Sequence, residues 1–273
     1  MVKLSSYHKK VTGLIVIAAV LTLAAIIFSP IKQSGNFYDY ADQRMFFSIP
    51  NFWNVISNLP FLYVGLKGLQ LFRQRSVAIE PNIVLQYPFF FFAIMLTFFA
   101  SSYYHLTPND FTLMFDRIPI TLAFIALYCI ILTEFVSRDA GRWLFFPMIV
   151  YGFLSIVYWY ITTLQNGRGD MSAYVLIQVI PIIHFPIILY FFCSRFTHRQ
   201  YYLYALIAYV LSKWAESNDD EIYALLGGIS GHSVKHVIAA LGAYFIYIGF
   251  RERKKDDSNT QEKKVAVKKK DTQ

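Results

Sequence analysis

Two histidines lie one helical turn apart near the C-terminus, in the stretch GHSVKHVIAALGAYFIYIGF that begins at Gly231. A helix would place His232 and His236 on the same face, because residues four apart are neighbours there. The stretch is apolar enough to enter a membrane, where ionisable side chains are costly and tend to be functional. Two histidines at this spacing are also a known zinc-binding pair. The pair therefore indicates a metal site whose remaining ligand comes from another helix.

The composition indicates a membrane protein. Of the 273 residues, 56% are hydrophobic and only 15% are charged, whereas a soluble domain has about 25% charged residues. A helix needs about 20 apolar residues to cross a bilayer. Eight segments meet or approach that length: residues 11–28, 51–72, 86–104, 112–135, 143–164, 173–193, 200–214 and 231–250. We therefore predict an all-α integral membrane fold, with a seven-helix transmembrane core plus one extra N-terminal transmembrane helix.

The charges of the loops define an orientation. With a cytoplasmic N-terminus, the inner segments KGLQLFRQRS, SRDAGR, SRFTHR and RERKK are all basic. The outer segments include LTPND and the acidic ESNDDEIYALLGG. This asymmetry follows the positive-inside rule, so we predict a multi-pass protein with both termini in the cytoplasm. We expect residues 1–30 to be a cytoplasmic segment and an uncleaved anchor, because IIFSPIKQ is a poor cleavage site. Residues 31–250 would form the seven-helix domain, and residues 251–273 a disordered basic tail.

The partners that we expect are the lipid bilayer and a membrane lipid. Half of the net charge of +8 lies in the tail after Phe250, where a basic segment beside a membrane is common. No nucleic-acid-binding motif accompanies that charge, so we expect no nucleic acid. The sequence indicates no particular protein partner.

The same orientation brings further polar residues to the depth of the two histidines. Ser101 and His105 end the third span at its outer side, and Asp116 begins the fourth. Three imidazoles and a water molecule make an open zinc site. A nearby carboxylate could accept the proton of that water, and a hydroxyl could donate to an oxyanion. We therefore predict an active site that opens toward the extracytoplasmic side.

Each of these residues also has a simpler interpretation. The two histidines could bond to neighbouring carbonyl groups, Asp116 could pair with an arginine, and Ser101 could serve helix packing. The outer acids Glu216, Asp219, Asp220 and Glu221 could be solvated, or one or two could hydrogen-bond to a metal-binding imidazole. His184, alone in the sixth span, is predicted to be a hydrogen-bonded packing residue.

Four segments carry a resemblance to a known family. SSYYH, FDRIP and ISGHSVKH resemble the signature motifs of the alkaline ceramidase family, within the CREST superfamily of membrane hydrolases and receptors. FWNVISNLPF resembles the first core helix of that family. The resemblance implies zinc held by His105, His232 and His236. It also implies that Asp116 activates the zinc-bound water and Ser101 stabilises the oxyanion. The implied reaction is hydrolysis of the amide of ceramide or a related lipid to a long-chain amine base and a fatty acid.

The family's eukaryotic members also bind calcium, through a loop that is altered here. Asp39 and Asp42 match acidic positions in that loop, whereas Asn51 replaces a glutamate and Arg44 replaces an asparagine ligand. Calcium requires several oxygen ligands, and a guanidinium among them would oppose it. We therefore do not expect Ca²⁺ to bind. Arg44 could instead pair with Asp39 or Asp42 and take over the structural role of the ion.

Two other functions fit a membrane protein with buried histidines. Relatives in the wider superfamily act as receptors for lipids or hormones, so a receptor-like protein with a zinc site is the first alternative. A signalling domain or a long soluble terminus would favour it, and the sequence contains neither. A transporter with a histidine proton relay is the second alternative. Transporters usually contain internal repeats and interrupted helices, and we find no convincing repeat here.

Overall fold

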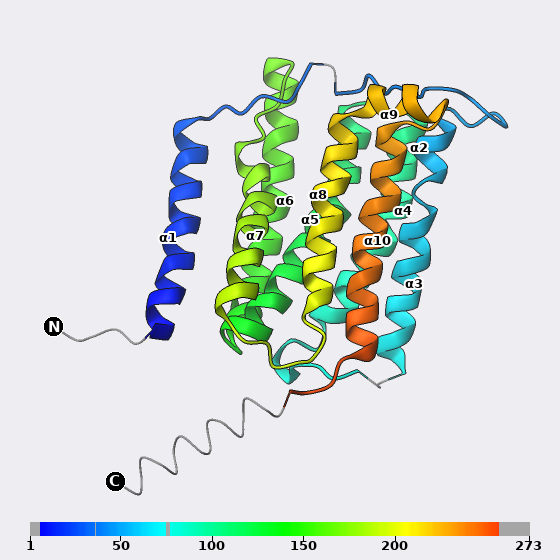
Figure 1. The fold of residues 1–273 in the computed structure, drawn as a ribbon. Coiled ribbons are helices and arrows are strands. Elements are labelled where there is room, and N and C mark those ends of the chain that lie inside the picture. The colour runs from blue at the N-terminus through cyan, green and yellow to red at the C-terminus, as the bar shows by residue number, and fades with distance from the viewer. Residues whose placement is uncertain (1–5, 36, 75–76, 257–273) are drawn as a thin grey trace, which may run out of the picture.

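The computed structural model describes residues 6–35, 37–74 and 77–256. Within these ranges the chain forms a bundle of upright helices (Figure 1). In chain order the elements are α1 (Ser6–Ile27), α2 (Phe52–Ile56), α3 (Leu59–Arg73), the 3₁₀ turn η1 (Pro81–Ile83), α4 (Gln86–Leu106), α5 (Asp110–Ile131), the π-helical turn η2 (Leu132–Val136), α6 (Ala140–Asn166), α7 (Ser172–Phe191), α8 (Gln200–Ser217), α9 (Asp219–Leu226) and α10 (Gly231–Glu252). Most of the predicted basic tail, from residue 257 on, lies outside the described residues.

The predicted all-α membrane fold is confirmed. Seven segments of the described chain are long and apolar enough to cross a membrane: α1, α2 with α3, η1 with α4, α5 with η2, α6, α7 and α10. The seventh predicted span, residues 200–214 within α8, is not among them, and the C-terminal half of α8 carries Lys213 and Glu216. It nevertheless lies inside the bundle, packed along α10 (Figure 1). With α8 included, the described bundle beside α1 has seven members.

The first helix stands at the edge of the bundle, as predicted for an extra N-terminal span. It packs against α7, and only 6% of its most apolar window is buried within the protein (Figure 1). After α1 the chain is joined to the bundle by hydrogen bonds from Ser29 and Ile31 to Asp170. One carboxylate oxygen of Asp170 accepts a hydrogen bond from the Ile31 backbone at 3.0 Å, and the other accepts one from the Ser29 hydroxyl at 2.8 Å.

The span predicted at residues 51–72 is divided into two helices. α2 ends at Ile56, and α3 begins at Leu59 with a proline in its first turn. Proline is favoured at that position because its missing N–H group has no partner in a first helical turn. The interruption leaves Ser57 and Asn58 between the helices, beside α4 and α10.

The acidic segment predicted as an outer loop contains a short helix. α9 begins with Asp219, Asp220 and Glu221, whose charges stabilise a helix N-terminus. It ends at Leu226 and is followed by Gly227, which adopts the left-handed conformation that often follows a helix. The chain then turns into α10 at Gly231. A Cβ atom at Gly231 would overlap the Ala215 carbonyl oxygen, so the start of α10 can approach α8 only with a glycine there.

The two ends of the bundle are chemically different. The start of α1 and the end of α10 lie at one end, whereas α2 and α9 lie at the other (Figure 1). At the first end, the fully buried Glu134 carboxylate accepts hydrogen bonds from Arg253 at 2.6 Å and from Tyr87 and Tyr202 at 2.7 Å each. This ion pair joins the residue that follows α10 to the turn η2 that follows α5. The candidate site described next lies toward the opposite end.

Candidate metal centre

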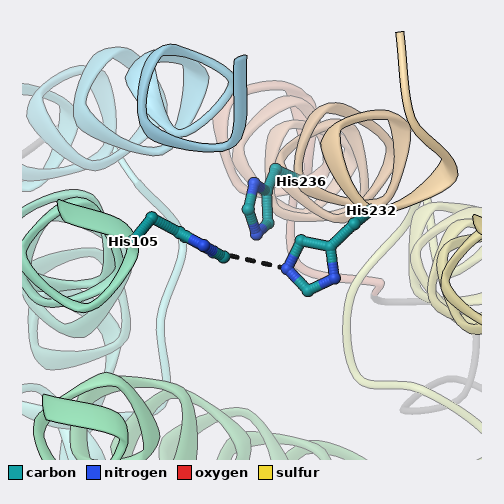
Figure 2. A group of neighbouring side chains, drawn as sticks. All are labelled: His105, His232 and His236. Atoms are coloured by element: carbon teal, nitrogen blue, oxygen red, sulfur yellow. Dashed lines mark hydrogen bonds between the residues drawn. The ribbon is translucent and has the colours of Figure 1, made fainter. Parts of the chain in front are cut away.

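Two helices bring the three predicted ligands together. His105 lies in the last turn of α4, and His232 and His236 lie in the first turns of α10 (Figure 2). The three side chains point toward one another, and their residues are only 1%, 6% and 4% exposed. One ligand atom from each lies within 4.8 Å of the others. The convergence expected from the topology is therefore present.

The donor set fits zinc. Tetrahedral zinc with Zn–N bonds of about 2.0–2.1 Å separates its nitrogen donors by about 3.3–3.4 Å. Nε2 of His105 and Nε2 of His232 lie 3.3 Å apart (Figure 2). Nδ1 of His105 is buried and has no hydrogen-bond partner. Three buried imidazoles suit zinc better than calcium or magnesium, which prefer oxygen ligands.

The ring of His236 is oriented by a residue that the sequence reasoning did not select. Its Nδ1 lies 2.8 Å from the Ser57 hydroxyl, between α2 and α3. This contact leaves Nε2 for the centre. The signal was the Ser-Asn pair of FWNVISNLPF, which carried part of the resemblance but no assigned role. Tyr40 was also not selected, although its ring centroid lies 4.4 Å from that of His232.

The acids of α8 and α9 support the centre, but not through the imidazole contacts that we considered. Asp219 accepts hydrogen bonds from the backbone N–H groups of His232 at 2.6 Å and Ala41 at 2.9 Å. It therefore ties the loop before α2 to the first turn of α10. Glu216 instead accepts a hydrogen bond from Lys235 at 2.9 Å. Helix α9 explains the difference, because it directs Asp219 toward the backbone at the start of α10.

Asp116 and Ser101 lie on the same cavity as the histidines. Asp116 comes from the second turn of α5 and Ser101 from α4, one turn before His105. The Ser101 hydroxyl lies beside the Asp116 carboxyl. Oδ1 of Asp116 is buried and has no hydrogen-bond partner. All five predicted site residues thus line one space or border it, which none of their simpler interpretations requires. His184, by contrast, lies 2.7 Å from the Tyr128 hydroxyl and is 2% exposed, so it is the packing residue that was predicted.

The cavity is large and mainly apolar. Its volume is about 500 Å³, and it extends from the histidines along α10 to Ile246. From His236 to Ile246 a helix rises about 15 Å. Phe90, Ile94 and Phe185 line the apolar part. A space of this length with polar groups at one end suits a molecule with one reactive head and one hydrocarbon chain.

The residues of the altered loop do not fit calcium. Both carboxylate oxygens of Asp42 accept hydrogen bonds from the Arg44 guanidinium, at 2.9 and 2.8 Å. Burial alone would raise the pKa of Asp42, but the bonds from Arg44 outweigh it and hold that pKa below its ordinary value. Asp39 is exposed, and the Asn51 amide donates to the His105 carbonyl oxygen at 2.8 Å. The oxygen atoms that calcium would need are therefore engaged or turned to solvent.

A comparison with protein families now identifies the group to which the fold and the site belong. A family model described as Ceramidase matches residues 41–271. The chain belongs to the ceramidase family. The match covers most of the chain and includes all the predicted site residues except Asp39. The chain has no significant match among curated proteins.

Membership confirms the resemblance drawn from the motifs. It implies a membrane hydrolase that acts on amide bonds, with a lipid substrate in the bilayer. The receptor and transporter alternatives gain nothing from the comparison. Within the ceramidase family, the buried histidine group is the part of this chain that could hold a metal ion, among the residues that the structure describes.

Proposed function

We propose that this chain is a zinc-dependent amidohydrolase that cleaves ceramide or a related lipid amide to a long-chain amine base and a fatty acid. The observation that carries the proposal is the meeting of three buried imidazoles and a buried carboxylate at the polar end of an apolar cavity of about 500 Å³. His105, His232 and His236 would hold the ion. When bound, zinc supplies a Lewis acid that acidifies water and polarises a carbonyl oxygen.

Asp116 is the candidate general base. Its Oδ1 has no partner among the described residues, so this oxygen can accept a proton from an attacking water molecule. The same carboxyl group can then return the proton to the nitrogen of the leaving amine, which cannot depart as an anion. Its position beside Ser101 keeps both steps within one small region.

Ser101 is the candidate donor to the developing oxyanion. Ser101 is 3% exposed and lines the cavity from α4. A hydrogen bond to an oxyanion is stronger in a site without competing water than it is in water. The apolar lining between His236 and Ile246 would hold the acyl chain and place the amide at the histidine end.

The orientation of the site in the membrane is part of the proposal. The described ends of the chain lie at the end of the bundle opposite α9 (Figure 1). The basic inner loops support a cytoplasmic location for those ends. The histidine end would then face the extracytoplasmic side.

The test is the metal content and amidase activity of the purified full chain. We expect about one zinc per chain in the wild type, and loss of both zinc and ceramide hydrolysis in His105→Ala and His236→Ala. Asp116→Asn should retain zinc but lose about a hundredfold or more of its turnover, because an amide cannot accept the proton. His198→Ala is the matched control, since His198 is exposed and outside the centre. Activity retained in metal-free His236→Ala would refute the mechanism.

A further inference from the structure

The polar end of the cavity carries more positive than negative side chains. Among the described residues that line it, Arg117, Lys213 and Lys235 are cationic, whereas Asp116 and Glu216 are acidic. The proposed reaction uses Asp116 and the histidines, and it assigns no role to the three cations. Of the three, Arg117 is buried, Lys235 is half-buried and Lys213 is exposed. A buried charge is costly unless it is paired, so the position of Arg117 beside the reacting groups requires an explanation.

Arg117 is the most constrained of the three. It is 4% exposed, and its Nη2 donates to the Gln33 side-chain oxygen at 2.7 Å. The centre of its guanidinium group lies 3.9 Å from the Trp159 ring centroid and 4.9 Å from that of Tyr174. These contacts hold the guanidinium in one place, partly through cation–π attraction.

One donor nitrogen of this fixed guanidinium forms no hydrogen bond with the described residues. Nη1 of Arg117 is buried and has no hydrogen-bond partner. No carboxylate oxygen in the described part of the chain forms an ion pair with Arg117 within 4.0 Å. Buried donors without partners are rare in native proteins. A guanidinium presents paired donors that match carboxylate and phosphate oxygens.

The two lysines share one carboxylate. Lys235 donates to Oε1 of Glu216 at 2.9 Å, and Lys213 bonds to Oε2 of the same side chain. Lys235 also lies close to the centre, with its Nζ 3.1 Å from Nε2 of His232. One acid therefore serves two ammonium groups, and a further anion at this position would complete the pairing.

From these contacts we propose that the polar end of the cavity binds an anionic group on the head of the substrate. The preferred substrate would be an N-acyl amine that carries a phosphate, sulfonate or carboxylate close to the amide, in preference to neutral ceramide. Arg117 directly follows Asp116 in the chain, and Lys235 directly precedes His236. All four residues line the same cavity, and Nζ of Lys235 lies 3.1 Å from Nε2 of His232, so the anionic group would lie close to the reacting amide. The inference rests on the proposed amidohydrolase function.

The first experiment compares substrates that share the same acyl chain and differ in the head group. The purified full chain in mixed micelles is given N-dodecanoyl sphingosine, its 1-phosphate and N-dodecanoyl glycine. We expect kcat/KM to be about tenfold or more higher for the two anionic substrates, which is the effect of about one hydrogen bond to a charged group. Cleavage of the neutral ceramide with equal or higher kcat/KM would overturn the inference and leave the amidohydrolase function standing.

Variants separate recognition from structural support. Arg117→Gln and Lys235→Gln should each lower kcat/KM by about tenfold for the anionic substrates and much less for ceramide. Arg117→Lys should recover part of the loss, because it restores the charge without the planar fork. Arg142→Gln is the matched control, since Arg142 is exposed at the start of α6. Equal losses of kcat/KM for all three substrates would mean that the cations support the structure and do not recognise the substrate. If Arg117→Gln does not fold, Lys235→Gln and Lys213→Gln decide the question.

A binding measurement does not depend on catalysis or on zinc. Monododecyl phosphate should raise the melting temperature of His236→Ala more than 1-dodecanol does at the same concentration. The difference should disappear when Arg117→Gln is added to His236→Ala. Equal effects of the two amphiphiles would overturn the anionic subsite, even if none of the three amides is hydrolysed. If none of the three amides is hydrolysed but the phosphate still binds selectively, the proposed function is refuted and the anionic subsite stands.

Discussion

The Ser57 hydroxyl lies 2.8 Å from Nδ1 of His236 and connects the interruption between α2 and α3 to the first turns of α10. The contact determines which ring nitrogen of His236 faces His105 and His232. Partners of this kind fix the tautomer and the orientation of a metal-binding imidazole. The residue between α2 and α3 therefore supports the histidine group from a third segment of the chain.

Ser57→Ala should weaken zinc binding without removing it. We expect the zinc affinity to fall by about ten- to a hundredfold, which is the usual effect of losing such a partner. Competition with a chromogenic chelator measures the affinity directly. Ser102→Ala is the control, because the Ser102 hydroxyl lies 3.5 Å from the Val55 carbonyl oxygen and contacts no histidine. An unchanged affinity in Ser57→Ala would exclude a role for Ser57 in orienting the ring.

Asp219→Ala should loosen the start of α10. The carboxylate accepts two backbone hydrogen bonds, from His232 and Ala41, and bonds to a charged acceptor contribute about 1.5–3 kcal/mol each. We therefore expect a loss of about 2 kcal/mol or more in stability, together with weaker zinc binding. Thermal unfolding in detergent, with and without added zinc, measures both effects. Asp220→Ala, one residue along on the exposed side of α9, should change neither. Equal effects of the two substitutions would contradict the assigned contact.

The sequence was sufficient to predict that the three histidines meet, because their positions follow from two simple patterns. The spacing of His232 and His236 places them on one helix face, and alternating loop charges place His105 at the same end. The structure brings these side chains together as expected. Apolar length likewise predicted the long helices, since a bilayer imposes a minimum span.

Other features depend on tertiary contacts that no local pattern encodes. Helix α9 begins with three consecutive acids, which are equally compatible with a loop. The role of Ser57 requires that α2 end beside α10, and the unused donor of Arg117 requires that Gln33 and Trp159 approach from distant segments. Such contacts between residues far apart in sequence have to be read from the folded chain.

Arg44 leads to a prediction about calcium. Its guanidinium bonds to both oxygens of Asp42 and to the Gly228 carbonyl oxygen, so it links the loop before α2 to the turn before α10. We expect millimolar calcium to leave the melting temperature and activity of the wild type unchanged. Arg44→Gln should lower the melting temperature, because it leaves the buried Asp42 carboxylate without its charged partner. Stabilisation of the wild-type protein by calcium would show that the loop binds the ion despite the arginine.

Asp170 makes the stability of the protein depend on pH. The pKa of its carboxyl group is lowered to about 2: burial would raise it, but hydrogen bonds from Ser172, Ser29 and Tyr158 outweigh that effect. A carboxylate whose pKa is lower in the folded state stabilises that state fully above its unfolded pKa, about 3.9. The contribution, on the order of 2 kcal/mol, is lost as the pH falls from about 4 to about 2.

Asp170→Asn should therefore be less stable than the wild type at neutral pH, and the difference should shrink as the pH falls through this range. Melting temperatures of the two proteins across a pH series test the prediction. The exposed Asp39 provides the matched control, and Asp39→Asn should follow the wild-type curve at every pH. A constant difference between Asp170→Asn and the wild type down to pH 2 would mean that its hydrogen bonds matter and its charge does not. The hydrogen bonds at position 170, without a contribution from the charge, would then stabilise the connection from α1 to the bundle.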